Sequence, residues 1–343
     1  MKTDKTIIKT RNSQDKKDCV TRYDFSSDVT EALKIKTLLQ AGLDGGLDYE
    51  ASSLYDMFLM QTLNVISLSP SGLALIKDAM SDGWMLGIDD LDGNDFSIDI
   101  SEKTILVSHF GLSPEGIMRS AYFSNLVLVN LVRALRDVWH EKRHGEFDTL
   151  FGPESILMLE RVRAADCDVL GIMVAWELRS EGHSDIWRHA IGSDNGDLAM
   201  CYSTYMERDP SSQFNGKALK ATFKEWFACE ERVNTCDHQT LDYMDEILKY
   251  AEEGNPFGEK IPTHVAIELI SCLPDKTAYL QGMGREILSD PLYFGLDDPL
   301  NQSHLMHILY DLEVVFVNNV PFRDAALAAR IFPDDGEVFS ESE

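Results

Sequence analysis

The chain of 343 residues is 44% hydrophobic and 26% charged, and its formal net charge is −27 at pH 7. It is long enough for one large domain or two medium ones with a hydrophobic core, and its composition is that of a globular protein. The negative charge argues against binding to nucleic acid or to anionic lipid, because phosphate contacts require lysine and arginine. Composition alone identifies no substrate and no oligomeric state.

Neither a secretory signal nor a membrane-spanning segment is evident in the sequence. The first twenty residues are polar, and the longest apolar run, LVLVNLVRAL, is far shorter than the ~20 residues that cross a bilayer. The six cysteines stand at irregular spacings without a Cys-x-x-Cys pair, which predicts reduced thiols rather than a thiolate zinc site. We therefore expect a cytoplasmic protein.

The first predicted segments are a tail and three helices. Residues 1–28 are expected to form a flexible basic tail, since the first twenty carry six Lys or Arg against three Asp. A helix is predicted over residues 29–42, and a second one follows Ser52 or Ser53, whose hydroxyl suits an N-cap. The third helix opens on the Ser-Pro pair of LSPSGL and closes on the glycine of SDG.

The hydrophobic period then changes from helical to alternating. The segments WMLGI, FSIDI and TILVS are separated by an Asp-Gly-Asn turn and by a second turn at residues 101–103. Apolar residues that alternate around such turns indicate short antiparallel strands. We expect these three to be the only strands of the chain.

A long helix follows the strands, with Ser113 as its cap, Pro114 at its first position and Gly145 as its stop. Further helices are expected from Pro153 onward, including the segment from THVAIELISCL to FRDAALAARIF near the C-terminus. The predicted fold is therefore α+β and mainly helical, with a small antiparallel sheet before a long helix.

The predicted organisation is one core followed by a helical region. We expect an α+β core at residues 29–250 and a C-terminal helical region at residues 251–334 packed on it. Residues 335–343 are expected to form an acidic tail.

The long helix ends in WHEKRH, which contains the pattern His-Glu-x-x-His. Residues at i and i+4 of a helix lie on one face, so His140 and His144 can reach a single zinc ion. Glu141 is placed to act as the general base that takes a proton from zinc-bound water. A third protein ligand must then come from another part of the chain.

Three stretches, SIDISEKTILVSHFGLSPE, ALRDVWHEKRH and RVRAADCDVLGIMVAWELR with the downstream FKEWF, resemble an uncharacterised bacterial family of zinc metallopeptidases assigned by motif. The resemblance spans roughly residues 84–245. That family is similar to the gluzincins, which implies a zincin-like fold, a zinc cofactor and hydrolysis of peptide bonds. It also implies a peptide or protein partner, with the substrate strand pairing along the edge of the TILVS region.

The resemblance further implies that the third zinc ligand is acidic and lies on the helix after the motif. In the family this helix opens with a run like Glu-Ala-Asp-Ala, whose Glu is the expected ligand, whereas Ala164 stands in that place here. Asp166 and Asp168 remain on the same helix and are the candidate ligands. Their side chains are one carbon shorter than that of glutamate, so the backbone would have to come closer. Glu160, off the expected place, is a further candidate.

A second hypothesis is a catalytically inactive zincin-like protein that acts as an interaction or regulatory module. The missing glutamate and the charged pair Lys142-Arg143 favour it. The histidines would then belong to a solvated helix end, where basic side chains favour the negative end of the helix dipole. Asp137 would pair along the helix with Arg133 or His140, or would orient an imidazole.

Two further groups of histidines could bind a metal in principle. His183 and His189 lie between two tryptophans in WELRSEGHSDIWRHAIG, where such a density of aromatic residues is more typical of helix packing. His304 and His307 stand one turn apart, with Asp311 one turn further. Because no partner motif accompanies them, we expect a surface helix there.

Overall fold

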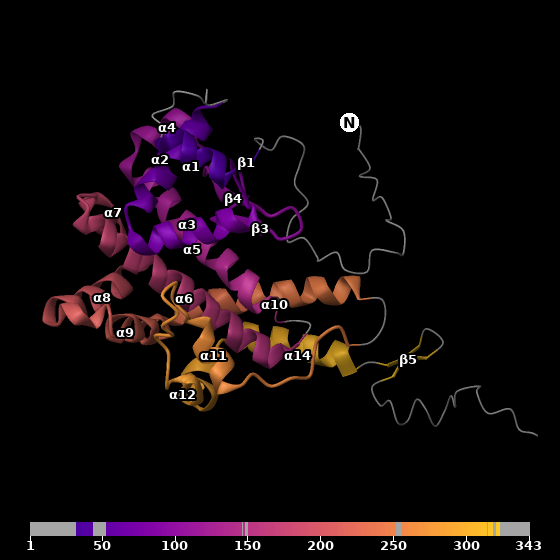
Figure 1. Cartoon of the computed structure of the whole chain (residues 1–343). Coiled ribbons are helices and arrows are strands. Elements are labelled where there is room, and N and C mark those ends of the chain that lie inside the picture. Colours follow the sequence, from indigo (N-terminus) through magenta and orange to yellow (C-terminus); the bar gives the residue numbers. More distant parts are fainter. Residues whose placement is uncertain are drawn as a thin grey trace, which may run out of the picture.

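The computed structural model describes residues 32–43, 53–145, 147, 150–251, 255–313, 315–317 and 320–322. The two predicted tails lie outside the described residues. Within them the chain is mainly helical and contains a small four-stranded sheet (Figure 1). The predicted α+β, mainly helical class is therefore confirmed.

The first half of the chain forms the sheet and the two longest helices. Its elements are β1 (Leu33–Lys34), α1 (Ile35–Leu43), α2 (Leu54–Ser67), α3 (Pro70–Asp82), β2 (Met85–Asp89), β3 (Phe96–Asp99), β4 (Thr104–Ser108), α4 (Pro114–Arg119), α5 (Ala121–His144) and α6 (Pro153–Ser180). Three of its helices begin at the predicted serines. The Ser53 hydroxyl accepts from the backbone of Asp56, whose carboxylate accepts from the backbone of Ser53. Ser69 and Ser113 cap helices that have proline in the first turn.

The second half is helical up to residue 313. Its elements are α7 (Ser184–Gly192), α8 (Gly196–Arg208), a 3-10 turn η1 (Pro210–Ser212), α9 (Lys217–Trp226), α10 (Glu230–Tyr250), α11 (His264–Ile270), α12 (Gly284–Ser289), α13 (Pro291–Phe294), α14 (Pro299–Glu313), β5 (Val315–Val317) and β6 (Val320–Phe322). The predicted helical segment from THVAIELISCL to FRDAALAARIF contains α11 to α14, but it is wrong at β5 and β6, which pair antiparallel. Their valine and phenylalanine residues favour a strand over a helix. Residues 323–332 of that prediction lie outside the described residues.

The sheet has the order β1-β2-β4-β3. Strands β1 and β3 pair antiparallel with their neighbours, whereas the central strands β2 and β4 pair parallel. The prediction of a purely antiparallel sheet is therefore wrong. The reason lies in the residues: β2 and β4 are apolar almost throughout and are buried on both faces, as parallel strands generally are.

The strand TILVS, which is β4, lies inside the sheet and has no open edge, since β2 and β3 flank it. A substrate strand could therefore not pair with TILVS itself, and the open edge of this region lies on a neighbouring strand. Among the described strands the open edge on that side belongs to β3, whose exposure alternates along FSID as an edge strand requires.

The core is built around α5 and α6, which pack against each other, while α10 packs against α6 and α14 against α10. Figure 1 shows the sheet and α1–α4 towards one end of this pair, with α10–α14 towards the other. The predicted long helix is interrupted at Ser120, whose extended backbone ends α4 and caps α5. No helix in the described part of the chain has both the length and the apolar character needed to cross a membrane.

Candidate functional site

Helices α5 and α6 are joined by a series of ion pairs that shows their antiparallel packing. The pairs are Glu141–Arg163, Asp137–Arg163, Arg136–Asp166 and Arg133–Asp168. As the number rises on one helix it falls on the other, so the His-Glu-x-x-His end of α5 faces the first half of α6. This packing brings the predicted site residues of both helices to one interface.

Asp166 is the predicted ligand that the fold places beside the motif. Its Oδ2 lies 2.8 Å from Nε2 of His140 and 2.5 Å from Nε of Arg136, and its Oδ1 accepts a hydrogen bond of 2.8 Å from Tyr279. Asp166, His140 and Arg136 are completely buried. Burial alone would raise the pKa of Asp166, but Arg136 and the hydrogen bond from His140 lower it to about 2.

Each histidine of the motif has one buried ring nitrogen without a hydrogen-bond partner. Burial, followed by the positive charge of Arg136, lowers the pKa of His140 to about 4, and burial, followed by Arg163, lowers that of His144 to about 4. Nε2 of the neutral His140 therefore donates to Asp166, which leaves the buried Nδ1 without a hydrogen-bond partner. Nε2 of His144 is likewise buried and without one. Neutral imidazoles with a bare nitrogen are what a metal ion requires.

The second hypothesis expects His140 on a solvated helix end. This expectation is wrong, because His140 has no exposed surface. The helix end does become polar and open at Lys142 and Arg143, both of which pair with Asp78 on α3. Arg143 also lies over the ring of Trp139, at 3.7 Å from its centre. The two charges inside the motif therefore bind α3 and do not face the histidines' buried side.

Asp168 has partners of its own, one on α5 and one on α9. Its Oδ1 forms an ion pair of 2.7 Å with Nε of Arg133, and its Oδ2 accepts a hydrogen bond of 2.8 Å from Trp226 on α9. Two residues along a helix correspond to a rotation of about 200°, so Asp168 points away from the direction of Asp166. The two candidate ligands therefore differ sharply, and only Asp166 contacts a histidine of the motif.

Glu141, the predicted general base, is paired with Arg163. One guanidinium nitrogen of Arg163 lies 3.1 Å from Oε2 of Glu141, and Nε lies 2.5 Å from Oδ1 of Asp137. Burial alone would lower the pKa of Arg163, but Asp137, Glu160 and Glu141 raise it above the usual value, so it is always charged. Asp137 thus pairs across to Arg163 of α6.

A zinc ion would need one ligand atom from each of three side chains close together, ~3–3.5 Å apart for bonds of ~2.0–2.2 Å. Among the described residues, His140, His144 and Asp166 do not bring such atoms within 4.8 Å of one another. Both oxygens of Asp166 already accept hydrogen bonds, and Arg136 shares the oxygen that faces His140. Two imidazoles fit a metal, but the carboxylate beside them is held by a guanidinium. The complete ligand set therefore does not fit zinc in this arrangement.

A cavity of about 470 Å³ lies beside this interface and not within it. Its walls come from the β2–β3 turn and β3, from α5, from α6 and from α10. They comprise Gly93, Asn94, Asp95, Phe96, Ser97, Ile98, Arg133, Asp137, Glu160, Arg163, Ala164, Cys167, Cys236, Gln239, Thr240, Asp242, Tyr243 and Glu246. The candidate Glu160 and Ala164, which stands where the family's glutamate is expected, both line this cavity, whereas neither motif histidine is among its lining residues.

The predictions for the other histidines have different outcomes. Trp176 and Trp187 pack edge to face with ring centres 5.0 Å apart, which confirms the packing cluster. His189 packs against Tyr122 with ring centres 5.1 Å apart. His304 instead lies near His238 of α10, a neighbour that the sequence did not indicate.

Three residues of the interface were missed as functional candidates. Arg136 stands one helical turn before His140, and Arg163 directly precedes Ala164, so both were visible in the sequence as charges near the motif. The sequence did not show that both side chains are buried. Tyr279 lies 113 residues beyond Asp166, and no local pattern connects the two.

Residues 118–280 match the model of a family described as "Putative metallopeptidase family (DUF6782)". The matched segment contains α5, α6 and the turn that carries Tyr279, and therefore the entire interface around Asp166. No curated protein and no solved structure matches the chain. The match supports the coarser part of the prediction, a metallopeptidase-like chain.

Proposed function

We propose that this chain is a non-catalytic relative of zincin-type metallopeptidases that binds an extended, basic polypeptide segment in the cavity beside β3. The observation that carries this proposal is the pairing of two buried arginines with the two carboxylates that a zinc peptidase needs. Arg136 holds Asp166, the candidate ligand, and Arg163 holds Glu141, the candidate base.

Charge explains why these pairs disfavour a metal. A divalent ion between His140 and Asp166 would lie close to the guanidinium of Arg136, which already supplies positive charge to the same oxygen. Arg136 has no exposed surface and also donates to the backbone carbonyls of Ile270 and Cys272, so it is fixed from three sides. A zinc ion would have to displace a buried, hydrogen-bonded cation, which costs several kcal/mol.

The architecture supports descent from a peptide-binding fold. An edge strand, β3, is followed by the central strand β4 and then by the long His-Glu-x-x-His helix α5, the order of elements that a zincin-like protein has. The open edge of β3 lines the cavity, and an extended peptide can add to such an edge through main-chain hydrogen bonds. The hydroxyl of Ser97 is buried there without a hydrogen-bond partner.

The charge of the cavity favours a basic occupant. Five carboxylates line it, on Asp95, Asp137, Glu160, Asp242 and Glu246, against the guanidiniums of Arg133 and Arg163. Both arginines are ion-paired within the fold, Arg133 with Asp95 and Arg163 with Asp137 of the same lining. Lysine or arginine side chains of a bound strand would therefore meet the carboxylates of α6 and α10, in a chain whose overall charge is strongly negative.

Zinc-dependent hydrolysis of peptide bonds is the second candidate function. The spacing of His140 and His144, their bare ring nitrogens and the family match favour it. In that case His140, His144 and Asp166 would hold the ion, which would supply an activated water, and Arg136 would have to release Asp166.

A hydrolysis assay separates the two candidates. We expect the purified full chain, supplied with excess zinc, not to cleave quenched-fluorescence peptides of basic or mixed sequence above the rate of the Glu141→Gln variant. Zinc-dependent cleavage that Glu141→Gln and His140→Ala both abolish would establish the peptidase and overturn the proposal. Neither Glu141 nor His140 lines the cavity, so peptide binding can be measured on the same samples.

Peptide binding itself is tested with a labelled peptide of alternating lysine and valine. We expect fluorescence anisotropy to show binding, with a matched glutamate–valine peptide remaining unbound. Glu246→Lys should weaken binding about tenfold, since charge reversal replaces an attraction of up to ~1 kcal/mol by a similar repulsion. Glu231→Lys, on the same helix but outside the cavity, is the control. Equal binding of both peptides, or an equal effect of both substitutions, contradicts the proposed site.

A further inference from the structure

We propose a divalent metal site between α10 and α14, formed by His238, Asp242 and His304. Among the described residues this is the group of histidine, cysteine and carboxylate side chains whose ligand atoms all lie within 4.8 Å of one another. The site is separate from the His-Glu-x-x-His helix, and it shares Asp242 with the cavity of the peptide-binding proposal.

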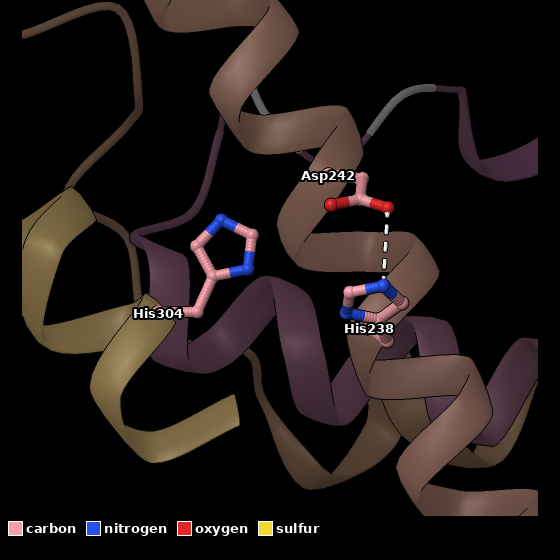
Figure 2. Close-up of side chains that lie close together, drawn as sticks. All are labelled: His238, Asp242 and His304. Carbon is pink, nitrogen blue, oxygen red and sulfur yellow. Dashed lines mark ion pairs between the residues drawn. The ribbon is translucent and has the colours of Figure 1, made fainter. Parts of the chain in front are cut away.

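The two helices present these side chains to a common space. His238 and Asp242 are one turn apart on α10, and Nε2 of His238 lies 3.6 Å from Oδ2 of Asp242. The ring centres of His238 and His304 are 6.3 Å apart. Figure 2 shows all three side chains between the helices, with one imidazole nitrogen of His304 turned towards His238 and Asp242.

A fourth residue holds His304 in this orientation. Nε2 of His304 lies 2.7 Å from Oδ2 of Asp245, which is one turn beyond Asp242 on α10. A histidine whose one nitrogen donates to a carboxylate keeps its other nitrogen bare and directed, and this arrangement is common for metal-binding histidines. Asp245 therefore acts as a positioning residue for His304.

The chemistry of the set points to a borderline transition-metal ion such as Zn²⁺. Two imidazoles and one carboxylate are a usual ligand set for zinc, whereas Mg²⁺ and Ca²⁺ prefer oxygen ligands alone. Small rotations would bring the three ligand atoms from their present separations to the ~3–3.5 Å that bonds of ~2.0–2.2 Å require. His238 and Asp242 are largely exposed, with 64% and 59% of their side chains accessible, so the ion could enter from solvent.

Such an ion would link two parts of the chain. His238 and Asp242 belong to the helix that forms one wall of the cavity, and Asp242 itself lines it. His304 belongs to α14, which packs on α10. A bound metal would therefore fix α14 to α10 at the rim of the cavity.

Titration calorimetry with Zn²⁺ tests the site. The full chain with His140→Gln and His144→Gln serves as the background, so that the motif helix contributes no binding. We expect one Zn²⁺ per chain, with His238→Gln and His304→Gln each weakening binding at least tenfold. His307→Gln, an exposed histidine one turn along α14, is the matched control and should leave the affinity unchanged.

The unfolding temperature is a second measurement, which identifies variants that lose zinc affinity because they misfold. Zn²⁺ should raise the unfolding temperature of the background protein, and Asp242→Asn, at an exposed position, should abolish that rise while leaving the metal-free unfolding temperature unchanged. Undiminished affinity in both His238→Gln and His304→Gln would overturn the site. Peptide binding is measured separately, so either proposal can fail while the other stands.

Discussion

Replacing Arg136 by methionine is expected to lower the free energy of unfolding by about 3–5 kcal/mol, the usual effect of removing one partner of a buried ion pair. The carboxylate of Asp166 would remain buried with only His140 and Tyr279 as partners. The backbone carbonyls of Ile270, at the end of α11, and of Cys272 would also lose this donor. Urea unfolding followed by circular dichroism measures the change.

Two controls define the cause of that loss. The double variant Arg136→Met/Asp166→Asn removes the buried charge together with its partner and should recover part of the stability. Lys103→Met breaks the exposed pair with Asp82 and should cost less than ~1 kcal/mol. A loss below ~1 kcal/mol for Arg136→Met would show that the guanidinium does not stabilise this interface.

In the proposed non-catalytic relative, Arg136 would take the place of the metal in joining the helix pair α5 and α6. In a zinc centre the ion joins the motif helix to the helix that carries the third ligand. Here the buried guanidinium of Arg136 makes that connection, from α5 to Asp166 of α6 and on to the end of α11 and the chain after it. A cation therefore still balances the charge of the carboxylate, but it is part of the chain.

Local features were predictable from the sequence because their causes are local. The hydroxyls of Ser53, Ser69 and Ser113 cap helices over three residues, and Gly145 ends α5 with a positive φ of 65°. The i, i+4 spacing likewise places His140 and His144 on one face of α5, as expected.

Long-range features were not predictable, because they depend on which elements meet. The strand β4 pairs between β2 and β3, and nothing in TILVS distinguishes an internal strand from an edge strand except its unbroken apolar run. Asp166 and Asp168 are equivalent candidates in the sequence, and only the packing of α6 separates them. His238 and His304 stand 66 positions apart by their numbers, and no local pattern connects them.

The second large effect is expected at Arg161, whose replacement by methionine should also lower the free energy of unfolding by about 3–5 kcal/mol. Its guanidinium binds both oxygens of Asp237 on α10, at 2.5 and 2.7 Å, and donates to the carbonyls of Tyr293 and Gly295. Burial raises the pKa of Asp237 even though Arg161 lowers it. Without Arg161 this carboxyl group must therefore take up a proton or remain buried as an unpaired charge.

The position of this pair connects stability with both proposed sites. Asp237 directly precedes His238, and the following turns of α10 carry Asp242 and Glu246 along the wall of the cavity. Arg161→Met should therefore weaken binding of the lysine–valine peptide and of Zn²⁺ together, whereas Arg136→Met should affect α10 less. Arg161→Met/Asp237→Leu is the control, because it removes both charges and should recover stability without restoring the two-point attachment of α10. Unchanged peptide and zinc affinities in Arg161→Met would mean that α10 keeps its position without this pair, and that the packing of its apolar face against α6 suffices.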